Sequence, residues 1–132
     1  MWNPRNIKIN PKVGAVLVAI AGPLSNLAMA AIAFAVLGQF IDTLDEFWIG
    51  ALYQFAFINA LLAVFNLIPV PPLDGSHVLF ALIPGDTYHL RAQLSQFGML
   101  AIFAVAFLFP QVIQVPTMYV MEFLAQIFFP LP

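Results

Sequence analysis

The chemistry-bearing residues of this chain gather in one short stretch, Asn66 to His77, with the sequence NLIPVPPLDGSH. It holds the carboxylate of Asp74 and, three residues later, the imidazole of His77. If a helix begins at Gly75, these two side chains share one of its faces. Carboxylate and imidazole groups are ligands for metal ions, and a carboxylate can also carry a proton.

Three prolines set the backbone of this stretch. Pro69, Pro71 and Pro72 cannot lie in a helix interior, and each pushes the residue before it toward extended conformations. At membrane depth, irregular backbone persists only where it is buried in protein or lines a wet cavity. We therefore expect this loop to face a site.

Asp74 has two interpretations. An ionised carboxylate between two apolar runs costs several kcal/mol unless it is paired, protonated or bound to a cation. No Lys or Arg occurs between Lys12 and Arg91, which favours a metal ion or a shared proton over a salt bridge. The alternative is a helix N-cap, and the two roles can coexist. For His77, the simpler interpretation is a hydrogen-bonded side chain, and metal ligation is the second.

Asparagines are the other polar candidates. Asn26 lies in AGPLSN, where Pro23 frees a backbone carbonyl that Ser25 or Asn26 can satisfy. The functional alternative for Asn26 is an amide that reaches into a cavity to hold an extended peptide or a developing oxyanion. Asn59 and Asn66 share a helical face and are expected to hydrogen-bond between helices, with Asn66 also beside the proline loop.

Composition places these residues in a membrane protein. The chain has 132 residues, 63% apolar and 8% charged, and a mean hydropathy of +0.98. An average soluble domain is about 25% charged, so a soluble monomer is excluded. The lack of cysteine excludes disulfides and thiolate ligands, and a net charge of −2 without a basic run argues against nucleic acid as a partner.

We expect an all-α membrane protein with about three transmembrane helices and the proline-rich L-D-G loop at membrane depth. Each span is an uncharged apolar run that can cross a hydrocarbon core of about 30 Å. The expected spans are 13–38, 47–68 and 97–115. Pro23 either kinks the first span or begins it after a short lead-in, and Pro110 is expected to kink the third. The placement of 116–132 stays open.

The charges predict an orientation. Basic residues fall on one side of the expected spans and most acidic residues on the other. The positive-inside rule then places the polar lead-in, 1–12, and the loop 86–96 in the cytoplasm, where Arg91 is expected to be solvated. We expect an integral protein of a bacterial inner membrane, in contact with lipid.

Two motifs in order resemble a known family. AGPLSN in one span, followed after a second span by FNLIPVPPLDGSHVL, resembles the C-terminal half of the site-2 protease family, the intramembrane zinc metalloproteases of the M50 type. The lead-in WNPRNIKINPK is also similar to that of the family. The resemblance makes 13–132 a partial transmembrane domain of this kind.

The resemblance implies roles for particular residues. Asp74 matches the aspartate of the L-D-G motif, which holds zinc, and Gly75 follows it. Asn66 and Pro69 match the preceding N-x-x-P, and Asn26 matches the asparagine of G-P-x-x-N, which lines the family's active site. The implied chemistry is a zinc-activated water that cuts a transmembrane substrate helix, with the Glu of H-E-x-x-H as general base.

The chain departs from the family because it contains no H-E-x-x-H. Two zinc ligands and the general base are therefore absent, and this chain alone is expected to be inactive. We expect the C-terminal part of such a protease, with Zn²⁺ held by Asp74 and by residues of missing N-terminal spans. The alternatives are a non-catalytic membrane scaffold of the same fold that binds a helix, and a small carrier that uses Asp74 as a proton or cation site.

Overall fold

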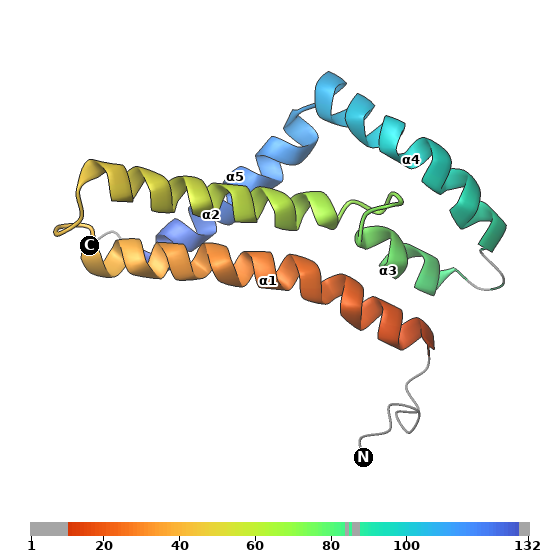
Figure 1. The fold of residues 1–132 in the computed structure, drawn as a ribbon, viewed down its shortest axis with the longest axis horizontal. Helices are drawn as coiled ribbons and strands as arrows, with labels where there is room; N and C mark the ends of the chain where they lie inside the picture. Colours follow the sequence, from red (N-terminus) through yellow and green to blue (C-terminus); the bar gives the residue numbers. More distant parts are fainter. Residues whose placement is uncertain (1–10, 84, 86–87, 130–132) are drawn as a thin grey trace, which may run out of the picture.

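The computed structural model describes residues 11–83, 85 and 88–129, which form helices and no strand (Figure 1). The expected all-α class is confirmed. The helices are α1 (Pro11–Phe40), α2 (Glu46–Asn66), α3 (Gly75–Leu82), α4 (Tyr88–Leu108) and α5 (Gln111–Phe128). Three segments are long and apolar enough to cross a membrane: Val13–Phe40, Glu46–Asn66 and His89–Leu108. Most of the predicted lead-in, 1–10, lies outside the described residues.

Helices α1 and α2 run antiparallel along the long axis of the molecule (Figure 1). α1 is continuous through Pro23, so the proline does not mark its start. α2 begins after Asp45, whose carboxylate accepts a hydrogen bond from the amide of Trp48 at 3.0 Å. It ends at Asn66, because the prolines that follow cannot continue the helical ladder.

Small residues let α1, α2 and α5 pack closely. Most members of their buried cluster are alanines. In a membrane, lipid is as apolar as leucine, so helices associate through close packing, and small side chains allow their backbones to approach. Phe34 makes edge-to-face contacts with Tyr53 and Phe129, at centroid distances of 6.4 and 6.3 Å. We call this cluster the alanine core, and it consists of Ala30, Ala33, Phe34, Ala56, Ala60, Met121 and Leu124.

Asn59 is buried next to Ala60 of the alanine core. Its side-chain nitrogen Nδ2 donates to the carbonyl oxygen of Phe55, one turn earlier in α2, at 2.8 Å. The predicted hydrogen bond between helices is therefore wrong for Asn59. The carbonyl oxygen of Phe55 in its own helix accepts the amide hydrogen instead.

The observed helices differ from the third predicted span, 97–115. α4 begins at Tyr88 and ends at Leu108, and a new helix begins at Gln111. Pro110 disfavours the helical conformation at Phe109 and has no amide hydrogen, so it separates two helices instead of kinking one. The polar residues before Phe97, predicted as a loop, form the first turns of α4.

The C-terminal segment folds as α5, which crosses behind α1 and α2 (Figure 1). Pro116 lies inside this helix, and the neighbouring Thr117 hydroxyl donates to the carbonyl of Ile113 at 2.7 Å. At its far end, a Cβ at Gly38 of α1 would stand 2.8 Å from the carbonyl oxygen of Phe128. Glycine at this position lets the two helix ends meet. The buried residues of α5 are Ile113, Thr117, Met121 and Leu124.

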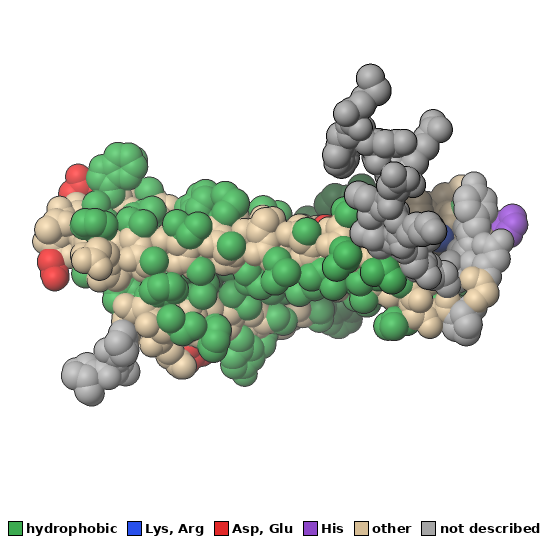
Figure 2. Space-filling view, turned by 90° about the horizontal axis from the view of Figure 1, so that it is seen from below, with side chains coloured by type: hydrophobic (Ala, Val, Ile, Leu, Met, Phe, Trp, Pro, Cys, Tyr) green, Lys and Arg blue, Asp and Glu red, His purple; other side chains and the backbone are tan. Residues whose placement is uncertain are grey.

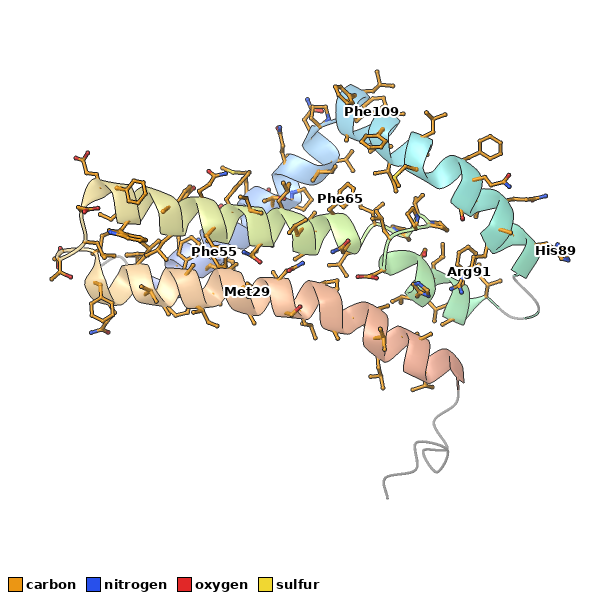
Figure 3. All side chains as sticks on the ribbon, viewed as in Figure 1. Met29, Phe55, Phe65, His89, Arg91 and Phe109 are labelled. Carbon is orange, nitrogen blue, oxygen red and sulfur yellow. The ribbon has the colours of Figure 1, made fainter. Side chains whose placement is uncertain are left out.

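Several acidic side chains gather at the end of the molecule where α1 turns into α2 (Figure 2). The basic side chain of Arg91 and the side chain of His89 lie at the opposite end, where Figure 3 labels them. Between them, large apolar side chains are exposed, as on a surface that faces lipid. The orientation of these ends across a membrane stays a prediction.

Candidate metal centre

The proline loop, residues 67–74, joins α2 to α3. Its backbone is irregular, as predicted, because the prolines interrupt the helical ladder. The loop folds on itself through short turns: the amide of Val70 donates to the carbonyl of Ile68 at 2.8 Å, and that of Leu73 to Val70 at 2.9 Å. These turns deliver Asp74 to the position directly before α3.

Asp74 occupies the N-cap position of α3, but its side chain makes no capping hydrogen bond. Its backbone is already helical, with φ −59° and ψ −37°, whereas capping residues adopt extended values. In the described part of the chain, the Asp74 carboxylate has no hydrogen-bond or ion-pair partner. The purely structural interpretation of this carboxylate is therefore not supported.

The carboxylate lies against Gly22 of α1. A Cβ at Gly22 would stand 2.7 Å from Oδ2 of Asp74, closer than real side chains approach one another. Glycine is thus required for this approach of the carboxylate to the helix. Because Gly22 belongs to AGPLSN, the fold brings the two sequence motifs into direct contact.

Asn26 lies one turn beyond Gly22, and therefore on the same side of α1. The Asn26 side chain is half-buried and forms no hydrogen bond with another described residue. The predicted structural role falls to Ser25, whose hydroxyl donates to the carbonyl of Gly22 at 2.7 Å. The side-chain amide of Asn26 therefore makes no hydrogen bond to the described backbone.

Asp74 also borders a cavity of about 250 Å³ between α1 and α3. His77 contributes to the same wall, as the spacing of the two residues predicts. The opposite wall belongs to α1 and has small or β-branched side chains without polar groups. The lining residues are Gly14, Ala15, Val18, Ala19, Asp74 and His77.

Arg91 of α4 reaches His77. Its Nη2 atom lies 3.1 Å from Nδ1 of His77, and its guanidinium carbon lies 5.1 Å from the centre of the Phe80 ring. Figure 3 shows Arg91 on the first turns of α4, beside α3. The prediction of a solvated Arg91 is wrong, because its guanidinium contacts His77 and Phe80 of α3.

The other predicted residues lie in the loop or next to it. Gly75 is buried, and a Cβ there would overlap the carbonyl oxygen of Leu67, so only glycine fits. Asn66 is the last residue of α2 and is half-buried, without a hydrogen bond to any other described residue. Pro69 is exposed.

Sequence reasoning missed three residues that hold this region together: Gly22, Gly98 and Arg91. A Cβ at Gly98 would overlap the carbonyl oxygen of Pro71, so α4 rests directly on the proline loop. The sequence could have indicated both glycines. A glycine inside a helix destabilises it by roughly 0.5–1 kcal/mol relative to alanine, so its presence suggests a close approach of another backbone or ligand. No pattern in the sequence around Arg91 indicated that its partner is His77, 14 residues earlier.

The residues present fit a metal site only in part. The described part of the chain contains no group of three His, Cys, Asp or Glu side chains that could hold a metal ion. Asp74 fits as one ligand, because its half-buried oxygens border a cavity and make no capping bond. A complete set of three such ligands therefore needs at least one residue from outside the described part of the chain.

Comparison with known proteins gives a consistent match. The model of peptidase family M50 matches residues 39–109. "Putative zinc metalloprotease YwhC" of Bacillus subtilis is 35% identical over 114 residues, covering 76% of this chain and 48% of that protein.

"Zinc metalloprotease MJ0392" of Methanocaldococcus jannaschii is 36% identical over 82 residues, with 62% of this chain and 24% of that protein covered. "Putative zinc metalloprotease Rip2" of Mycobacterium tuberculosis is 34% identical over 95 residues, with 71% and 36% covered. The chain thus spans half or less of the length of these relatives. No solved structure matches.

Proposed function

The chain belongs to peptidase family M50, and from that membership we propose that it is the C-terminal part of a zinc-dependent intramembrane metalloprotease. Its substrates are transmembrane helices of membrane proteins, and Asp74 is one of its zinc ligands. The observation that carries this proposal is the Asp74 carboxylate, which makes no capping bond and lies against Gly22 at the edge of a cavity.

Electrostatics support a cation at this carboxylate. A half-buried charge at the end of an apolar helix costs several kcal/mol unless a cation or a proton compensates it. Among the side chains that the structure describes, the basic one is Arg91, and its guanidinium contacts His77 and Phe80. A metal ion bound by Asp74 and by ligands outside this chain compensates the charge without a salt bridge.

Each motif of the chain has a task in this mechanism. Zinc, when bound, supplies a water of lowered pKa and polarises the substrate carbonyl. Asp74 would hold the metal, and Gly22 and Gly75 let its carboxylate and the loop lie close to their neighbours. Asn26, one turn beyond Gly22, donates its amide to the extended peptide or to the developing oxyanion.

Residues outside this chain complete the centre. The chain has no H-E-x-x-H, so it contributes one zinc ligand, and the other ligands and the general base belong to further spans of the same protein. We place the protein in a bacterial cell membrane with the N-terminus of this chain in the cytoplasm, on the basis of the positive-inside rule. Its apolar helices contact lipid and the substrate helix.

The decisive experiment measures zinc and proteolysis in the full-length protein. We expect about one zinc per molecule and cleavage of a transmembrane reporter, both lost in Asp74→Ala. Asp45→Ala is the matched control, because Asp45 caps α2 at the other end of the molecule. Zinc content that is unchanged in Asp74→Ala contradicts the ligand assignment. A protein without zinc that still retains a partner helix after Asp74→Ala supports the scaffold instead.

A further inference from the structure

The contact between Arg91 and His77 determines which nitrogen of the imidazole carries the proton. Arginine has only donors, so the bond of 3.1 Å between Nη2 and Nδ1 requires that Nδ1 accepts. A nitrogen that accepts a hydrogen bond carries no proton, and a doubly protonated ring has no lone pair to offer. The contact therefore selects the imidazole tautomer that has its proton on Nε2.

Arg91 is held in place on two sides. Its guanidinium lies over the Phe80 ring of α3 at 5.1 Å, within the range of a cation–π contact. Its helix is seated by Gly98, two turns further along, which packs on the carbonyl of Pro71, and by the buried Ile102 one turn beyond that. Arg91, Gly98 and Ile102 share one face of α4, so the face that contacts the loop also carries the arginine.

The tautomer decides what His77 offers to the cavity it shares with Asp74. Nδ1 is occupied by Arg91, so Nε2 is the remaining polar atom of the side chain. Because Nε2 carries the proton, it donates a hydrogen bond and has no lone pair for a metal ion. Zinc ligation through Nε2 needs the opposite tautomer, whose Nδ1 proton would face the donors of Arg91.

We propose that Arg91 is a positioning residue that locks His77 as an Nε2–H donor in the Asp74 cavity. In this role His77 does not ligate zinc and donates to the oxygen of the scissile peptide carbonyl, where negative charge develops during cleavage. The role at the peptide rests on the proposed protease function, whereas the tautomer does not. This proposal assigns α4 a task at the site, since it carries both Arg91 and the glycine that rests on the proline loop.

The tautomer is tested by nitrogen-15 NMR of histidine side chains in the full-length protein in detergent micelles at mildly alkaline pH. The His77 signals are assigned by their loss in His77→Gln. We expect the pattern of the neutral Nε2–H form in the wild type, a mixture of tautomers in Arg91→Met, and the wild-type pattern again in Arg91→Lys, which keeps a donor. An Nδ1–H form in the wild type, or no change in Arg91→Met, overturns the proposal.

The role at the peptide is tested by zinc content and kinetics together. We expect His77→Ala to keep its zinc and to lower kcat by about 100-fold, the usual cost of removing one oxyanion donor, with partial recovery in His77→Gln. Loss of zinc in His77→Ala makes His77 a ligand and overturns the proposal. A wild-type protein with neither zinc nor activity defeats the protease function, and the NMR result still decides the tautomer.

Discussion

Two regions of this molecule are held together in different ways. The alanine core packs methyl groups and a phenylalanine ring between α1, α2 and α5, and it contains no charge. The region around Asp74 is joined by glycines that lie against a carboxylate or a backbone carbonyl: Gly22 on Asp74, Gly75 on Leu67 and Gly98 on Pro71. The first region buries apolar surface, and the second brings polar atoms to a cavity.

This difference separates stability from chemistry within one short chain. Close apolar packing resists any change of volume, whereas a carboxylate without a partner adds little to folding and is available to a ligand. Substitutions in the alanine core are therefore expected to lower stability. Substitutions near Asp74 are expected to lower activity while the helices remain folded.

Asp74→Asn gives the largest expected effect. The amide cannot supply the charged oxygen of a zinc ligand, so the full-length protein is expected to lose about 1000-fold in kcat/KM, corresponding to about 4 kcal/mol of metal-based stabilisation. Its thermal stability without zinc should not fall, because the carboxylate makes no capping bond. Cleavage assays and unfolding in micelles are compared. A large loss of metal-free stability would make Asp74 a structural residue and remove the contrast between the regions.

Ala60→Leu tests the alanine core. Ala60 is fully buried between helices, so the added methyl groups are expected to lower the free energy of unfolding by about 1–3 kcal/mol. Ala51→Leu is the matched control on the same helix, because Ala51 is exposed and the larger side chain meets lipid. Unfolding is measured by denaturant titration in micelles. Equal stability of the two variants would mean that this interface is loose.

Gly22→Ala probes the contact between α1 and the carboxylate of Asp74. The new Cβ would meet Oδ2 of Asp74 at 2.7 Å, and a displacement of about 1 Å at a catalytic group can cost about 100-fold in rate. Gly50→Ala is the control, because a Cβ at Gly50 has no neighbour within 4 Å and alanine favours the helix by about 1 kcal/mol. We expect kcat to fall only in Gly22→Ala. Normal activity in that variant would show that the carboxylate has room to move.

The sequence predicts the helices well where polarity marks their ends. The first two predicted spans agree with α1 and α2 within a few residues, because acids near Asp45 and the proline at Pro69 bound uncharged runs. The third differs because the polar residues before Phe97 resemble a loop in composition, although they form helical turns that pack Arg91 on α3.

The candidate site follows the same division. Asp74 could be singled out locally, because prolines break the backbone beside an acid in an apolar chain. Its contact with Gly22 and the pairing of Arg91 with His77 could not, since both depend on how α1, α3 and α4 lie against one another. Patterns among neighbouring residues in the sequence do not predict contacts between separate helices. The zinc role of Asp74 stays a prediction.

Ser25→Ala and Asn26→Ala give the smallest expected change in stability and the finest test of the comparison. Ser25 spends its hydroxyl on the carbonyl of Gly22, whereas Asn26 makes no hydrogen bond to another described residue. Ser25→Ala should lower the free energy of unfolding by about 0.6 kcal/mol, the average for a side-chain hydrogen bond in a membrane protein, and leave kcat unchanged.

Asn26→Ala should do the reverse, with unchanged stability and a fall in kcat of about 100-fold if its amide serves the oxyanion. Parallel unfolding and cleavage measurements on the full-length protein separate the two. Opposite responses would show that two adjacent residues of α1 have different roles, Ser25 in stability and Asn26 in catalysis. Loss of stability in Asn26→Ala would instead assign its amide to packing, and the chemical region would shrink to the loop and α3.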